Sequence, residues 1–186
     1  MLYRELKPED LKPELFQDFN RRQVVRDCWR REGDHWVIRP DPFIDDWTAA
    51  ERAELLTELR ELLVLGGFVY GCFCCGSLKG FVSVAFGHFG PQQEYMDMTN
   101  LHVSAEFRRS GIGTKLFLAA ADWASAQGAG KLYLSAHSAA ESQAFYRTLG
   151  CTDAAYPQQH HQEKEPFDCQ MEYDLSLNRP YSEAKI

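Results

Sequence analysis

The sequence has little that would mark a membrane, secreted or nucleic-acid-binding protein. Its longest uncharged apolar stretch, residues 62–78, is broken by glycines, whereas a membrane-spanning helix needs about 20 predominantly apolar residues. The first ten residues, MLYRELKPED, lack the positive stretch and apolar run of a secretory signal, so we expect a cytoplasmic protein. A net charge of -7 would repel a phosphate backbone, so we expect no nucleic-acid partner.

The cysteines and histidines do not predict a disulfide framework or a metal site. Six cysteines in 186 residues are too few for a disulfide scaffold, and Cys72, Cys74 and Cys75 lie in an apolar run typical of a buried strand. Cys72 and Cys75 have C-x-x-C spacing, but no second pair with that spacing exists. His160 and His161 are adjacent, and on a strand they would face opposite ways. We therefore expect no metal ion.

The composition predicts one ordinary globular domain. The apolar fraction of 45% and the charged fraction of 25% are those of a typical folded protein. No repeat, low-complexity tract or linker divides the chain, so residues 1–186 are expected to form a single domain.

The pattern of apolar residues predicts a mixed α/β fold. Residues 18–32 are strongly charged and are interpreted as partly helical, whereas Thr48 and Glu51 form a capping box that starts a helix. We expect the polar stretch 158–168 to form a loop, and Pro166 disfavours helix just before it. We expect strands at residues 2–6, 36–43, 68–75, 78–86, 95–103 and 131–136, helices at 111–127 and 139–149, and strands around Tyr156 and at 169–175.

The stretch from Asn100 to Leu116, NLHVSAEFRRSGIGTKL, is the most informative. A strand leads into a basic, glycine-bearing turn, and a helix begins at that turn. Free N–H groups at a helix start form an anion site, and glycines let a phosphate approach closely. The Walker pattern is absent, and Leu116 stands where G-x-G-x-x-G needs its last glycine. The sequence does contain R-x-x-G-x-G, from Arg108 to Gly113, preceded by L-x-V.

A second motif follows in SQAFYRTLGC, from Ser142 to Cys151. Together the two motifs resemble those of the GNAT superfamily of acyl-CoA-dependent N-acyltransferases, over roughly residues 68–175. The resemblance implies a GNAT fold, with a mostly antiparallel sheet flanked by helices, and acetyl-CoA as cosubstrate. One departure is Ala139, where many members carry an asparagine that faces the cofactor. The residues expected to bind acetyl-CoA are Leu101, His102, Val103, Arg108, Arg109, Ser110, Gly111, Ile112, Gly113, Thr114, Ser142 and Tyr146.

The chemistry of acyl transfer to an amine needs a proton donor, an oxyanion site and a base. Tyr146 is the best candidate to protonate the departing thiolate, because a phenol holds its proton at neutral pH; the alternative is a packed core tyrosine. The resemblance implies that backbone N–H groups near Val103 hold the acyl oxygen. Asp97 or His137 would take the proton of the amine, although either can also be an ordinary surface residue.

The stretch from Gln158 to Asp168 is expected to lie beside the acceptor. Glu163 and Glu165 would attract a protonated amine, and His160 or His161 would assist its deprotonation; the alternative is a solvated loop. We thus expect an N-acetyltransferase acting by direct transfer on a small or peptide amine, and a homodimer is compatible with the resemblance. The competing hypothesis is an acyl-CoA-binding or sensing domain without catalysis.

Overall fold

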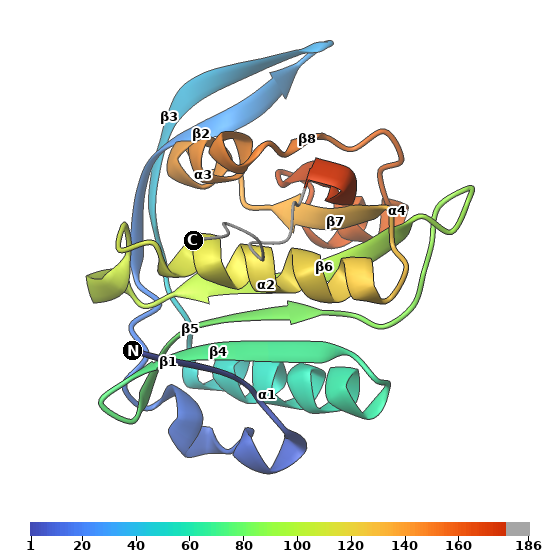
Figure 1. Cartoon of the computed structure of the whole chain (residues 1–186). Helices are drawn as coiled ribbons and strands as arrows, with labels where there is room; N and C mark the ends of the chain where they lie inside the picture. Colours follow the sequence, from blue (N-terminus) through green and yellow to red (C-terminus); the bar gives the residue numbers. More distant parts are fainter. Residues whose placement is uncertain (178–186) are drawn as a thin grey trace, which may run out of the picture.

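The central feature of the fold is a seven-stranded mixed sheet with strand order β1-β4-β5-β6-β7-β9-β8 (Figure 1). We analysed a computed structural model that describes residues 1–177. Only β6 and β7 run parallel, and every other neighbouring pair in the sheet is antiparallel. The strands of this sheet are β1 (Leu2–Glu5), β4 (Phe68–Cys74), β5 (Ser77–Val84), β6 (Tyr95–Val103), β7 (Lys131–Ala136), β8 (Thr152–Asp153) and β9 (Cys169–Asp174).

A separate antiparallel hairpin of β2 (Gln23–Glu32) and β3 (His35–Asp45) forms a long arm beside α3 (Figure 1). The arm is tied to the main body where the N–H of Trp29 donates to the carbonyl of Ser138, at 2.7 Å. The helices are α1 (Ala49–Val64), α2 (Ile112–Ala126), α3 (Ala140–Leu149) and α4 (Gln159–Lys164), with 3-10 turns at Pro8–Asp10, Pro13–Phe16, Ala105–Phe107 and Leu175–Leu177.

Helices cover both faces of the sheet, and each face has its own apolar core. On one face, Ile112, Leu116 and Phe117 of α2 pack against Val82 and Met96 of the strands below. On the other face, α1 packs with the 3-10 turns of the N-terminal segment against β4 and β5. The capping box that starts α1 forms as expected: Thr48 accepts from the N–H of Glu51 at 3.2 Å, and the Glu51 carboxylate accepts from the N–H of Thr48 at 2.7 Å.

Two neighbouring strands of the sheet separate partway along their length. β6 pairs with β7 only at the start, from Tyr95 opposite Lys131 to Asp97 opposite Tyr133. β6 continues beside β5 to Val103, and a bulge between Met98 and Asn100 interrupts their register. A gap therefore opens between β6 and β7 beyond Asp97, where the backbone of β6 has a neighbouring strand on one side only.

Two of the expected elements are wrong, and a short helix was not expected. Residues 23–32 form a strand and not a helix, because Val25 and Cys28 are buried and the chain pairs with β3 over almost its whole length. Tyr156 lies in a loop, and the short strand β8 precedes it. The segment after it contains α4, which ends before Pro166 in agreement with the restricted backbone of a residue that precedes proline.

Within residues 1–177, no helix is both long enough and apolar enough to span a bilayer. All six cysteines are free thiols, and four of them are buried.

Candidate active site

The turn between β6 and α2 leaves a helix start open to an anion. Gly111 is the residue before α2 and has a φ of 83°, a left-handed conformation that favours glycine. No atom lies within 4 Å of the position that a Cβ on Gly111 would occupy. Glycine has no side chain to cap the helix, so the N–H groups of the first turn are available to a ligand. The structure thus has an uncapped helix start at the glycine-bearing turn from which the sequence predicts phosphate binding.

The two arginines of this turn have different surroundings. The guanidinium of Arg108 donates to two backbone carbonyls, from Nε to Val103 at 3.1 Å and from Nη2 to Arg21 at 2.7 Å. Burial lowers the pKa of Arg108, and the nearby Arg21 lowers it further. Arg109 has a φ of 61° and is exposed together with Ser110. Arg108 therefore braces the turn, and Arg109 is free to meet a phosphate.

Helix α3 closes over the start of α2. A Cβ on Gly113 would lie 3.2 Å from the Phe145 ring, so the glycine allows the two helices to touch at this point. Ser142, one turn earlier on α3, is half-buried, as is Thr114 in the first turn of α2.

The L-x-V segment at the end of β6 divides its side chains between the two faces of the sheet. Leu101 and Val103 pack against the core beneath α2, whereas the His102 ring lies 4.8 Å from the ring of Trp47, on the opposite face. Burial lowers the pKa of His102 well below its usual value, and the charges of nearby arginines lower it further. His102 is therefore neutral at physiological pH and does not face the turn that starts α2.

The backbone of Val103 faces the gap between β6 and β7. The N–H of the next residue, Ser104, donates to the carbonyl of Lys79 on the β5 side. Because N–H directions alternate along an extended strand, the N–H of Val103 points away from β5 and toward the gap. An acyl oxygen placed there would meet this donor.

Tyr146 lies on α3, with its ring 6.3 Å from that of Phe117 of α2. Burial raises the pKa of its hydroxyl, and the charges of Cys151 and Asp168 add to the increase. Within residues 1–177 the hydroxyl makes no hydrogen bond. Tyr146 therefore carries its proton at neutral pH.

Asp97 lies at the last paired position of β6, where the gap begins. One of its oxygens, Oδ2, lies 2.9 Å from Nε2 of His161 on α4. Its other oxygen, Oδ1, is buried and has no hydrogen-bond partner among the residues that the structure describes. Asp97 and His161, which the sequence analysis names for separate roles, are thus in hydrogen-bond contact although they lie 64 residues apart in the chain.

His137, the other expected base, accepts a hydrogen bond at one of its two ring nitrogens. The N–H of Ala139 donates to Nδ1 at 3.1 Å, so the neutral ring carries its proton on Nε2, which lies 3.8 Å from the Asp45 carboxylate. Burial lowers the pKa of His137, and Asp45 partly offsets that effect. The nitrogen that would have to accept a proton already accepts a hydrogen bond, so the geometry favours Asp97 over His137.

Sequence reasoning missed the role that Asp168 could have in this site. Burial raises the pKa of Asp168 to about 7, and the carboxylates of Glu165 and Asp45 contribute to the increase. Asp168 also acts electrostatically on the Tyr146 hydroxyl. Nothing in the local sequence distinguishes this aspartate, because its burial depends on the fold.

The two expected acceptor-binding glutamates lie in different places. Glu165 follows α4 and acts electrostatically on Asp168 and His137, so it lies near those two side chains. Glu163 is exposed on α4 and accepts a hydrogen bond from Gln159 at 2.8 Å. His160 is exposed on the same helix, with its ring 4.1 Å from that of His161.

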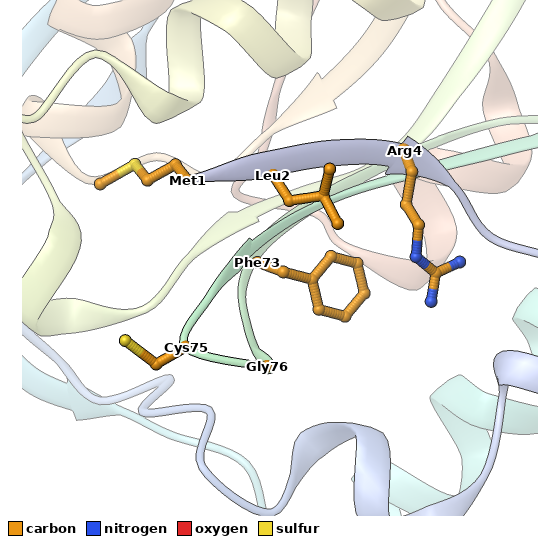
Figure 2. Close-up of a pocket in the computed structure, with 6 residues that line it drawn as sticks. All are labelled: Met1, Leu2, Arg4, Phe73, Cys75 and Gly76. Carbon is orange, nitrogen blue, oxygen red and sulfur yellow. The ribbon is translucent and has the colours of Figure 1, made fainter.

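A separate hollow lies at the edge of the sheet, beside the turn between β4 and β5 (Figure 2). Its one charged lining residue, Arg4, is paired with Asp10 at 2.8 Å, and none of its residues was predicted to bind a ligand. Its lining residues are Met1, Leu2, Arg4, Phe73, Cys75 and Gly76.

A family model for the acetyltransferase (GNAT) family matches residues 7–151, so the chain belongs to that family. The fold is similar to nourseothricin acetyltransferase, with a TM-score of 0.65 and 20% identity over 94% of this chain and 98% of that one. It is also similar to a Bacillus anthracis protein assigned as a streptothricin acetyltransferase and solved with acetyl coenzyme A; here the TM-score is 0.64 and the identity 15%, over 92% and 95% of the two chains.

Aminoglycoside 6'-acetyltransferase type Ii is a third structural neighbour, with a TM-score of 0.59 and 16% identity over 94% of this chain and 97% of that one. No curated protein sequence matches the chain. The chain is thus a member of the GNAT acetyltransferase family, and the GNAT fold expected from the two motifs is confirmed.

Proposed function

We propose that this protein transfers an acetyl group from acetyl-CoA directly to a primary amine, with Tyr146 as the general acid. The observation that carries the proposal is the Tyr146 hydroxyl, which is kept protonated by burial and has no partner within the described residues. When bound, acetyl-CoA supplies the acetyl group as a thioester. The N–H groups at the start of α2 and the exposed Arg109 would hold its pyrophosphate, and the N–H of Val103 would hold its acyl oxygen.

The proton balance of the reaction assigns a role to each side of the gap. The ammonium form of the acceptor must lose one proton before it can attack, and the attacking amine must lose a second as the amide forms. We assign proton acceptance to Asp97 together with His161, which lie in hydrogen-bond contact. Tyr146 would give its proton to the departing sulfur and regain one from solvent afterwards.

The charges around the gap favour a cationic acceptor. Asp45 and Glu165 both act electrostatically on Asp168, and Asp97 lies where the gap begins. Arg21 neutralises part of this charge through its ion pair with Asp45. The structural neighbours named for nourseothricin, streptothricin and aminoglycoside substrates support a small acceptor, and a peptide amine is the second possibility.

A panel of amines tests the activity and its competing hypotheses together. Purified protein would be incubated with acetyl-CoA and aminoglycosides, streptothricin, polyamines or lysine-bearing peptides, and products would be read by mass spectrometry. Thiol reagents are unsuitable because Cys75 is exposed. We expect acetylation of a small amine, with the Tyr146→Phe variant as the control. Acetylation of peptides alone would indicate a protein-directed enzyme, and CoA binding without any product would indicate a sensing domain.

A further inference from the structure

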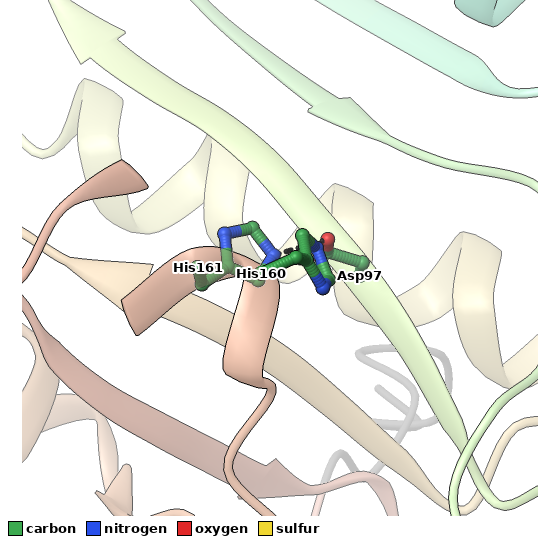
Figure 3. A group of neighbouring side chains, drawn as sticks. All are labelled: Asp97, His160 and His161. Carbon is green, nitrogen blue, oxygen red and sulfur yellow. Dashed lines mark hydrogen bonds and ion pairs between the residues drawn. The ribbon is translucent and has the colours of Figure 1, made fainter. Parts of the chain in front are cut away.

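Two histidines and an aspartate converge where α4 meets β6 (Figure 3). His160 and His161 are neighbours in the first turn of α4, and Asp97 reaches toward them from the strand. The possible ligand atoms of the three side chains all lie within 4.8 Å of one another. Within the part of the chain that the structure describes, this is the one such group of three histidine, cysteine or acidic side chains.

His160 and His161 lie on a helix and not on a strand. Successive side chains of a strand face opposite ways, but successive side chains of a helix are only about 100° apart around its axis. Because this segment is helical, the rings of His160 and His161 lie on the same side, with their centroids 4.1 Å apart. The opposite directions that a strand would give these two side chains therefore do not apply to this segment.

The aspartate has bonding capacity that the protein does not use. Asp97 Oδ1 is buried without a hydrogen-bond partner among residues 1–177, although Oδ2 contacts His161. A buried carboxylate oxygen without a partner costs free energy unless some group binds it. The side chain of Asp97 is 16% exposed and that of His161 is 17% exposed, so a small ion can reach both.

We propose that Asp97, His160 and His161 bind one divalent transition-metal ion of the Zn²⁺ class. Imidazole nitrogen and carboxylate oxygen are ordinary Zn²⁺ ligands at about 2.0–2.2 Å, and a water molecule would complete a tetrahedral site with three protein ligands. Ca²⁺ and Mg²⁺ are disfavoured because they prefer oxygen ligands alone. The exposed ring of His160 can rotate toward the ion, and the contact between His161 and Asp97 would be replaced by two metal bonds.

This ion would inhibit the enzyme, a consequence that rests on the proposed function. The lone pairs that Asp97 and His161 need in order to accept a proton are the same ones that would bind the ion. A bound Zn²⁺ would therefore leave the amine without its proton acceptor, and CoA binding at the start of α2 would be unaffected.

Binding is tested first, without CoA or acceptor. Chelator-treated protein is titrated with Zn²⁺ by calorimetry and with Co²⁺ by visible absorption, which reports coordination geometry. We expect one ion per chain, with affinity at least tenfold weaker in His160→Ala and in His161→Ala. His35→Ala removes an exposed histidine on the hairpin arm and should bind as the wild type does. Unchanged binding in the His160 and His161 variants would overturn the proposal.

The free cysteines provide the other way in which the proposal can fail. Cys74 and Cys75 are adjacent, with their sulfurs 3.9 Å apart, and thiolates also bind Zn²⁺. If Co²⁺ binds these thiolates, the spectrum has a thiolate-to-cobalt charge-transfer band, and the Cys74→Ser/Cys75→Ser variant loses both the band and the ion. That result would place the ion on the β4–β5 turn and refute the histidine site. The expected result is an absorption spectrum that this double variant does not change.

Inhibition is tested second, as the ratio of transfer rates with and without Zn²⁺. For the wild type, we expect the rate with Zn²⁺ to be at least tenfold lower than the rate without it. For His160→Ala, we expect the two rates to be nearly equal. A normal rate in saturating Zn²⁺, with binding confirmed, would show that the ion does not occupy the proton acceptor. If Asp97→Asn keeps the wild-type rate, the proposed base is wrong, and the calorimetric result still decides the metal site.

Discussion

The two sides of the gap between β6 and β7 are built in different ways. We assign the donor side mainly to one continuous segment, from the end of β6 to the first turn of α2, where backbone N–H groups would bind the ligand, together with Tyr146 of α3. We assign the acceptor side to side chains from separate elements: Asp45 at the end of β3, Asp97 on β6, His161 on α4 and Asp168 just before β9. The donor side can therefore be disrupted through backbone conformation, and the acceptor side through charge.

The same contrast exists between two helix starts. α1 begins with a complete capping box, in which Thr48 and Glu51 satisfy each other's backbone donors. α2 begins at a glycine with no capping side chain, and its first N–H groups are left for a ligand. A capped start stabilises its own helix, whereas an uncapped start at the end of a strand serves binding.

The largest expected effect is the loss of CoA binding in Gly111→Val. A β-branched residue is strained at a φ of 83°, and its side chain would occupy the space that the pyrophosphate needs. CoA at 100 times its Kd should raise the free energy of unfolding of the wild type by about 2.7 kcal/mol and thereby raise its melting temperature. We expect CoA to leave the melting temperature of Gly111→Val unchanged.

The matched control for this change is Gly128→Val at the other end of α2. Gly128 has a φ of 89° and no atom near its missing Cβ, so the backbone strain is comparable. Both variants should be less stable than the wild type, but only Gly111→Val should lose the response to CoA. Equal responses in the two variants would contradict the assignment of the donor side.

The next largest effect is expected in Tyr146→Phe. Removal of the hydroxyl should lower kcat by on the order of 100-fold, because the departing thiolate loses its proton donor, and should leave the Kd for CoA nearly unchanged. Tyr173→Phe is the control, since its ring also packs against Phe117, at 5.1 Å. A wild-type kcat for Tyr146→Phe, measured where chemistry limits the rate, would make Tyr146 a packing residue.

A smaller effect should separate the two glutamates of the acceptor side. Glu165 acts on Asp168 and His137, whereas Glu163 is bonded to Gln159 on the exposed face of α4. We expect Glu165→Gln to raise the KM for a cationic acceptor severalfold and to leave the KM for acetyl-CoA unchanged. Glu163→Gln should change neither constant. The same acceptor KM in both variants and the wild type would mean that α4 and the loop after it do not contact the acceptor.

The smallest effect concerns the pH dependence of stability. The pKa of Asp168 is about 7 in the folded protein against 3.8 in its unperturbed state, so the folded state binds this proton more tightly than the unfolded state. Its contribution to the free energy of unfolding must then decrease as the pH rises from about 4 to about 7. We expect Asp168→Asn to raise the melting temperature by a few degrees at pH 8, and by less at pH 5.

Asp27→Asn is the control for this measurement, because Asp27 is exposed on β2. Its effect on the melting temperature should be the same at both pH values. If Asp168→Asn also gives equal shifts at pH 5 and pH 8, Asp168 does not hold a proton in the folded protein, and the electrostatic account of the acceptor side needs revision.

The residues that we assign to the donor side can be named from the sequence because their signals are local. The glycines, the arginines and the start of α2 are adjacent in the chain, and Tyr146 lies in a second motif with its own spacing. The acceptor side depends on contacts between distant segments. The pKa of Asp168 is raised by its burial and by the nearby Glu165 and Asp45, which only the fold brings about, and His161 meets Asp97 only because of the position of α4.

The errors in the predicted elements have related causes. β2 carries many charged residues because a two-stranded arm exposes most of its surface, and that charge resembles the pattern of a solvated helix. α4 is short and polar, so it has no apolar periodicity that could reveal it. That residues 1–186 form one domain and that the protein dimerises both stay predictions; residues 178–186 lie outside the described part of the chain.

The most direct test of the account is a crystal structure of the protein with acetyl-CoA. The account predicts that the pyrophosphate accepts hydrogen bonds from N–H groups at the start of α2, between Gly111 and Thr114. It also predicts that the thioester lies in the gap between β6 and β7, with its oxygen near the N–H of Val103 and its sulfur within reach of the Tyr146 hydroxyl. A thioester bound outside this gap, or a sulfur far from Tyr146, would contradict it.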